Sequence, residues 1–382
     1  MIHHDSRDYN VAASEAATKG RVKMEEIIHN GIASATATIE AIANRVLSDK
    51  VVRAPGITIV PKGFGWDLGL SGPGIHHPLH DHAFAQVTEN VGVPRKFVND
   101  LEGEVEGDGE NADRWGKALV AHNVNTILSH RVKQRNLLRI EGDTVKGFLS
   151  DKFRRLDSRP LLESFISRCQ EMGLVPIQGV HSDTKCRVRA VMPHVFEPVA
   201  NEVMIFGVEW GNSDFGDGGH VVNLWTMRVW CTNLAVTDKC LRQIHLGGRL
   251  SEDISYSERT YQLDTKANAS ALKDIVSNAI SPKRVNGMLE AIKNASEKDI
   301  TGKDGIDAIL KKFLDKNDIL KVKGLYDGPD VVNLPAGNNL WRLSNAVSWL
   351  AQDKGMSADR KLELQTVAGN LIPHKAADAL AI

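Results

Sequence analysis

The sequence predicts an α+β protein in which a helix crosses one face of a curved antiparallel sheet, flanked by N-terminal helices and a helical C-terminal region. Three observations predict this class. Short β-rich runs recur between residues 137 and 231, a helical pattern with one apolar face interrupts them, and long helical stretches follow residue 251. We therefore expect four regions, at 1–55, 56–136, 137–250 and 251–382.

Residues 1–55 are expected to form a helical arm. Alanine, glutamate, isoleucine and lysine are frequent between residues 11 and 48, and Ile27, Ile32 and Ile39 recur at loosely helical spacing. An arm of this kind could mediate oligomerisation, so we expect a homo-oligomer.

Residues 56–136 are expected to hold a loop and a small helical region. Prolines and glycines between residues 53 and 78 predict a linker or an irregular loop. Helices are then predicted from residue 79 to Gly92, at 95–101 and at 115–132.

Residues 137–250 are expected to be the α+β core. Two β-rich runs at 137–140 and 145–153 are joined by a short hairpin connection. A helix follows from 159 to 172 and ends at Gly173. Four further strands are predicted, at 175–181, 186–192, 203–209 and 221–231.

Residues 251–382 are expected to be helical. The predicted helices cover 257–295, with a break at Ser281-Pro282, and then 305–317 and 339–351. A polar loop is predicted between the last two.

The overall charge does not favour any class of partner. The chain has 382 residues, of which 47 are basic and 48 acidic, giving a formal charge of -1. Attraction to a polyanion must therefore come from local clustering. The N-terminus lacks the apolar run of a signal peptide, and no stretch approaches the roughly 20 apolar residues of a membrane span. We expect a cytoplasmic protein without a membrane partner.

One predicted strand carries a row of cations. Lys185, Arg187 and Arg189 are two residues apart, so they should share one face while Cys186 and Val188 turn toward the core helix. A spacing of about 7 Å fits the phosphates of an extended single strand of nucleic acid. An ordinary solvated strand face is the alternative, and the sequence leaves both open.

Other residues could extend this surface into a groove. Arg154 and Arg155 end one core strand, and Arg228 lies in a later one. Trp225 is a candidate for stacking on bases, as in proteins that bind single strands without sequence preference. The alternative is that this tryptophan packs in the core.

Two groups of residues could hold a metal ion. His80 and His82 have ligand spacing, but Asp81 between them is also a natural N-cap for the helix that follows. Asp214 and Asp217 could bind Mg²⁺ for phosphoryl chemistry, or could belong to a glycine-rich turn. The cap and the turn are favoured, so no metal or other cofactor is expected. The chain has no Walker loop or dinucleotide fingerprint either.

Several motifs along the chain resemble a known family. They are the segments 146–157, 210–216, 228–233 and 245–247, with weaker similarity at 83–86 and around Trp341. In order and spacing this set is similar to a family of phage and plasmid proteins called domain of unknown function 932. The resemblance implies a mobile-element protein in a bacterial host, and the family name itself assigns no activity.

These observations favour a non-enzymatic protein that binds or anneals single-stranded DNA in recombination or replication, without ATP. Two alternatives remain open. One is a metal-dependent nuclease that uses the histidine or aspartate residues. The other is an inhibitor or scaffold that binds a host protein.

Overall fold

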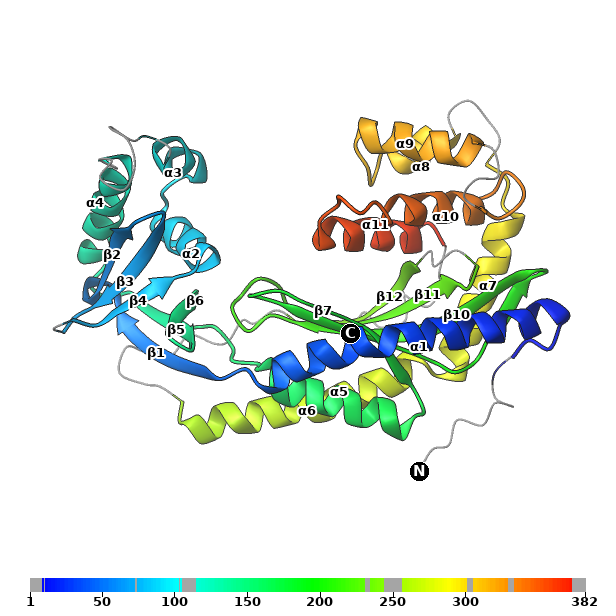
Figure 1. The fold of residues 1–382 in the computed structure, drawn as a ribbon, viewed down its shortest axis with the longest axis horizontal. Coiled ribbons are helices and arrows are strands. Elements are labelled where there is room, and N and C mark those ends of the chain that lie inside the picture. The colour runs from blue at the N-terminus through cyan, green and yellow to red at the C-terminus, as the bar shows by residue number, and fades with distance from the viewer. Residues whose placement is uncertain are drawn as a thin grey trace.

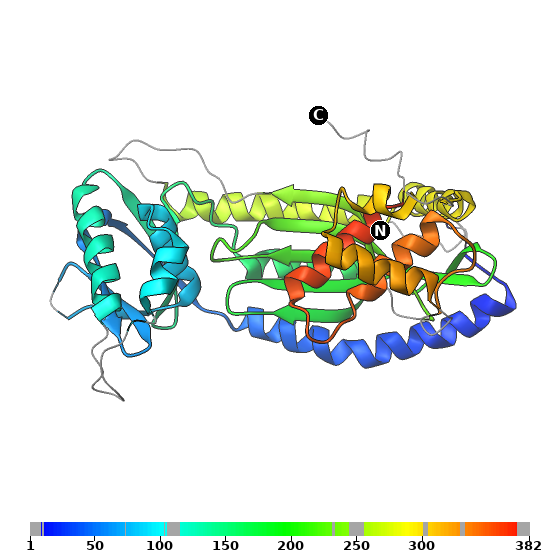
Figure 2. The same cartoon turned by 90° about the horizontal axis from the view of Figure 1, so that it is seen from above.

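The computed structural model describes residues 9, 11–72, 74–102, 104, 115–230, 234–243, 256–300, 305–328 and 333–372. Within these residues the predicted α+β class is confirmed. The molecule is elongated, with one sheet and its helices at one end and a second sheet, sandwiched between helices, forming the larger part (Figures 1 and 2).

The first sheet has six strands in the order β1-β5-β6-β4-β3-β2. The strands are β1 Leu47–Arg53, β2 Ile57–Lys62, β3 Gly65–Leu70, β4 His76–Leu79, β5 Arg135–Glu141 and β6 Thr144–Ser150. Three helices pack against it: α2 Asp81–Val91, α3 Arg95–Glu102 and α4 Trp115–His130. Its core holds the stacked rings of Trp66 and Phe84, whose centroids are 4.2 Å apart.

The second sheet has the order β12-β11-β10-β8-β7, and a further strand, β9, pairs with β10. The strands are β7 Val175–His181, β8 Cys186–Val191, β9 Phe196–Val199, β10 Glu202–Asn212, β11 His220–Arg228 and β12 Leu234–Gln243. The pairings among these strands are antiparallel.

Helices cover both faces of the second sheet. Below it in Figure 1 lie α5 Ser158–Glu171 and α6 Glu258–Ala279, and Phe165 of α5 stacks on Trp210 of β10. Above it lie α8 Gly305–Leu310, α9 Lys316–Asp327, α10 Leu340–Leu350 and α11 Ala358–Asn370, which α7 Pro282–Glu297 connects to α6. The predicted crossing helix is therefore α5.

The long helix α1, Glu15–Ala43, packs along β7, the last strand in the order of the second sheet. Two glycines allow a close approach, because a Cβ on Gly31 would lie 2.1 Å from the Ile177 carbonyl oxygen and one on Gly179 would lie 2.5 Å from Thr38. Ser34 Oγ donates to the Gly179 carbonyl at 2.9 Å and accepts from the Gly179 N–H at 3.3 Å. The predicted arm thus lies against the sheet.

A loop between β10 and β11 joins the two sheets. Arg139 of β5 is fully buried; its guanidinium donates to Asp49 at 3.0 Å and to the Asp214 carbonyl in this loop at 3.0 Å. It also bonds Asp157, just before α5. Gln86 of α2 donates to the carbonyl of Phe215 in the same loop at 2.8 Å.

The structure corrects two expectations about the strands. Residues 53–78 are not an irregular loop, because β2, β3 and β4 lie there, and Pro61 is tolerated in β2 because β2 is an edge strand. The strand pair β5–β6 does not belong to the sheet crossed by α5. It pairs with β1 and β4 in the first sheet. This sheet therefore combines strands from three of the expected regions, and the predicted boundaries at residues 55 and 136 do not separate independent units.

Other predicted elements agree closely with the structure, and five were missed. β7 has its predicted bounds, α2 ends at Gly92 with φ of 79°, and α6 and α7 separate at Ser281-Pro282. The missed elements are β1, β9, β12, α9 and α11.

Candidate functional site

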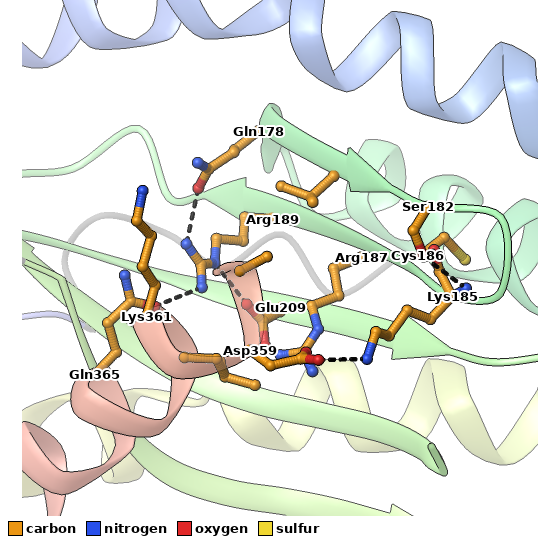
Figure 3. A pocket seen from close by; sticks show the side chains of 13 residues that line it. Gln178, Ser182, Lys185, Cys186, Arg187, Arg189, Glu209, Asp359, Lys361 and Gln365 are labelled. Atoms are coloured by element: carbon orange, nitrogen blue, oxygen red, sulfur yellow. Dashed lines mark hydrogen bonds and ion pairs between the residues drawn. The ribbon is translucent and has the colours of Figure 1, made fainter. Parts of the chain in front are cut away.

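Strand β8, together with Lys185 just before it, places the three predicted cations on one face of the second sheet. Lys185, Arg187 and Arg189, which we call the basic stripe, point away from α5 (Figure 3). Cys186, Val188 and Ala190 alternate with them and lie in the hydrophobic core that contains Leu161 and Phe165 of α5. The predicted orientation of this strand is confirmed.

The basic stripe is not an open strand face, because α11 lies across it. Lys185 Nζ is 2.6 Å from Asp359 Oδ2 at the start of α11 and 3.3 Å from Asp217 Oδ2 in the β10–β11 loop. Arg189 Nη2 donates to Gln365 Oε1 at 2.9 Å. This contact with α11 corrects the alternative of a solvated outer face.

A buried carboxylate on the neighbouring strand β10 lies beside the stripe, on the same face of the sheet. Glu209 is 0% exposed; it accepts from Arg189 Nε at 2.6 Å and from Asn223 Nδ2 at 3.0 Å, and Arg187 Nη1 is 3.5 Å away. Burial alone would raise the pKa of Glu209, but the charges of Arg189 and Arg187 outweigh it and the pKa is lowered. Glu209 is therefore ionised and neutralises part of the stripe.

Two cavities flank the N-terminal half of α11. The first, here the Gln178 cavity, has a volume of about 150 Å³. The second, here the Arg242 cavity, has a volume of about 250 Å³. The Gln178 cavity is lined among others by Gln178, Val180, Arg189, Glu209, Lys361 and Gln365. The Arg242 cavity is lined among others by Asn212, Asp217, Gly218, Asn223, Arg242 and Thr366. Lys185, Cys186, Arg187 and Leu362 line both, so the cavities are neighbours on the same sheet face.

Cations outnumber carboxylates around the two cavities. The basic residues are Lys185, Arg187, Arg189, Arg242 and Lys361, and the acidic ones are Asp217, Asp359 and Glu209. Within the described part of the chain, neither the Lys361 nor the Arg242 side chain forms a hydrogen bond or ion pair, and buried Arg187 Nη1 has no hydrogen-bond acceptor. The site therefore holds positive charge that an incoming anion could neutralise.

Comparison of the chain with protein-family models, curated proteins and solved structures finds no match. The similarity to domain of unknown function 932 accordingly stays a prediction. Of its segments, the end of 228–233, at residues 231–233, and all of 245–247 lie outside the described residues. No described helix is long and apolar enough to span a bilayer.

Three arginines predicted to extend the groove form structural ion pairs elsewhere. Arg154 binds Asp264 of α6, with Nε 2.6 Å from Oδ2, and Arg155 stacks on Tyr261 of α6, with Cζ 4.2 Å from the ring centroid. Arg228 is only 2% exposed, and its guanidinium contacts both carboxylate oxygens of Glu202. This placement corrects their predicted role as phosphate contacts.

Trp225 is also placed in the core and not at a surface. It is 0% exposed, and its ring covers Gly207 so closely that a Cβ there would lie 2.4 Å from the ring. It packs in a cluster with Met24, Ile205 and Met227. The structure therefore corrects the prediction that Trp225 stacks on bases.

The histidines proposed as metal ligands are tied to the start of α2. His80, and not Asp81, is the N-cap, since its Nδ1 accepts from the His82 N–H at 3.1 Å. His82 Nε2 lies 3.1 Å from the Phe215 carbonyl oxygen. The two side chains thus serve the helix terminus and the joint between the sheets.

The two aspartates proposed as metal ligands have structural partners as well. Asp214 accepts from the Ser158 N–H at 2.7 Å and from Arg45 Nη1 at 3.1 Å, and Asp217 accepts from Thr184 Oγ1 at 2.6 Å. In the described parts of the chain, three or more metal-ligating side chains nowhere come together. The aspartate loop serves as a connection, as the turn alternative predicted.

Proposed function

We propose that the chain binds single-stranded nucleic acid through its phosphates at the two cavities beside α11. The excess of cations there carries the proposal, because the chain as a whole has a charge of -1 and offers no general attraction to a polyanion. In line with the family resemblance, we place this activity in the cytoplasm of a bacterial host, where a mobile-element protein would hold or anneal DNA without ATP.

The shape of the site favours a single strand over a duplex. Both cavities lie beside α11, where Leu362 lines each of them. A duplex presents its phosphates on a wide, stiff helix, whereas a single strand can turn successive phosphates and bases into separate cavities. Asn212 and Asn223 add neutral polar groups in the Arg242 cavity.

The homo-oligomer belongs to the same proposal. The outer surface of α1 exposes Val22 at 58% and Ile32 at 44%, and such apolar side chains are suited to contact another copy. The mass of the free protein in solution, measured in parallel with the binding experiments, gives its oligomeric state.

Removing Lys361 and Arg242, whose side chains have no partner among the described residues, tests the proposed phosphate binding directly. We expect the double variant Lys361→Ala/Arg242→Ala to bind a fluorescent single-stranded oligonucleotide more weakly at 50 mM salt, because two phosphate contacts are lost. The slope of log affinity against log salt concentration should fall by about 0.7 for each contact. Neither residue has a described partner, so the fold should be unchanged.

The matched control removes the same charge elsewhere. Lys293 and Lys312 are exposed on or beside helices of the C-terminal region and have no partner among the described residues. Lys293→Ala/Lys312→Ala should bind like the parent. Equal affinity and slope for the two double variants would show that the cavities do not bind the phosphates.

A second variant should strengthen binding. Asp359 pairs with Lys185 at 2.6 Å and places a negative charge at the mouth of the Gln178 cavity. We expect Asp359→Asn to raise the affinity for the same oligonucleotide about two- to five-fold at low salt, since one exposed charge contributes roughly 0.5–1 kcal/mol. Asp274→Asn, at an exposed position on α6, is the control and should have no effect. Unchanged or weaker binding by Asp359→Asn would contradict the proposal.

A further inference from the structure

The Gln178 cavity has features that a phosphate site does not need. Its walls include the apolar side chains of Val180 and Leu362. Its volume of about 150 Å³ equals that of an engineered protein cavity that takes benzene. An aromatic ring of one nucleobase therefore matches the space better than a strongly hydrated anion does.

The hydrogen bonds of Arg189 fix the orientation of two glutamine side chains in this cavity. Arg189 donates to Gln178 Oε1 at 2.8 Å and to Gln365 Oε1 at 2.9 Å (Figure 3). Since a guanidinium can only donate, these contacts fix both amides with the oxygen toward Arg189 and the NH₂ group elsewhere. Neither NH₂ group has a partner within the described residues. The cavity thus offers two free amide donors.

Arg189 also supplies a flat surface held in one position. Glu209 Oε2, Gln178 and Gln365 bind three different nitrogens of its guanidinium. A planar guanidinium stacks well on a base, and one that already uses three of its five N–H donors in its plane keeps those hydrogen bonds when a ring covers it.

We infer that the Gln178 cavity is a nucleobase site and that the neighbouring Arg242 cavity takes the phosphate of the same nucleotide. Leu362, which lines both, would lie beside the sugar. This inference rests on the proposed function and names the part of the nucleotide that each cavity takes.

The donors indicate which base is preferred. The two amide NH₂ groups and the arginines of this cavity all donate, while Glu209 already accepts from Arg189 and Asn223, and Asp359 at its mouth already accepts from Lys185. Guanine presents two adjacent acceptors, O6 and N7, whereas adenine presents N7 beside a donor. The cavity should therefore bind a guanine nucleotide more tightly than an adenine nucleotide.

The test compares three small probes by isothermal titration with the full chain: dGMP, dAMP and 2-deoxyribose 5-phosphate. We expect dGMP to bind about tenfold more tightly than the sugar phosphate, because it adds stacking and two hydrogen bonds, and more tightly than dAMP. Leu362→Trp, which fills the cavity, should reduce dGMP binding to the level of the sugar phosphate. Arg242→Ala should weaken all three probes equally.

The outcomes separate this inference from the proposed function. Equal binding of dGMP and the sugar phosphate, with oligonucleotide binding still dependent on Arg242 and Lys361, would overturn the base site and leave the proposed function intact. Selective dGMP binding without any oligonucleotide binding would support the base site and overturn the proposed function. If Leu362→Trp does not fold, Gln178→Leu removes one donor at similar volume and should reduce the preference for dGMP.

Discussion

Replacing Arg139 by methionine should lower the free energy of unfolding by about 2–3 kcal/mol, because the change removes a buried cation from two partly buried carboxylates and leaves the Asp214 carbonyl without its donor. Arg139 is 1% exposed and contacts Asp49, Asp157 and the Asp214 carbonyl. These partners come from β1, from the segment before α5 and from the β10–β11 loop. The substitution therefore weakens the contacts that connect the two sheets.

Urea denaturation followed by both circular dichroism and tryptophan fluorescence measures this effect. The parent should unfold in one transition, and Arg139→Met should unfold at lower urea with the two probes separated, because the sheets are less strongly coupled. Arg53→Met makes the same change at an exposed position of β1 and should stay within about 0.5 kcal/mol of the parent. A midpoint for Arg139→Met equal to that of Arg53→Met would contradict the structural role given to Arg139.

Replacing Glu209 by glutamine should cost about 2–3 kcal/mol at pH 7, since two charge-assisted contacts to Arg187 and Arg189 are weakened in a buried setting. The cost should depend on pH. The pKa of Glu209 is lowered in the folded chain, so its charge stabilises the fold fully above the unfolded pKa of about 4.3. That stabilisation is lost as the pH falls through the lower, folded pKa.

The free energy of unfolding measured from pH 7 to pH 3 tests this dependence. The difference between the parent and Glu209→Gln should be constant down to about pH 5 and then shrink. Glu290→Gln, at an exposed position of α7, should show no such difference at any pH. A constant difference across the whole range would mean that the Glu209 charge does not contribute.

The sequence was sufficient to orient the basic stripe, because strand alternation is a local property. Arg187 and Arg189 of β8 and Lys185 just before it share a face as expected, with Cys186 and Val188 on the other. The partners of the stripe could not be predicted the same way. Glu209 pairs with Arg189 through the register of β8 and β10, and register depends on the packed sheet.

Helix α11 was missed although the sequence contains a signal for it. Ser357 caps its start by accepting from the Arg360 N–H, and Leu364, Val367, Ala368 and Leu371 follow at helical spacing. Strand β1 was harder to detect, because Asp49 and Lys50 interrupt its apolar residues and the preceding helix extends the helical pattern to its start. Its place next to β5 becomes evident only from the pairing of Leu47 with Glu141.

The contact between α1 and β7 has a consequence for solubility. An edge strand with free N–H and C=O groups is a template for pairing with another chain, and β7 is an edge strand of its sheet. Ser34 occupies both backbone groups of Gly179, and the tight glycine crossing at Gly31 leaves no room for a foreign strand. The N-terminal helix therefore shields this edge, and growth of the sheet into fibrils from β7 would require α1 to detach first.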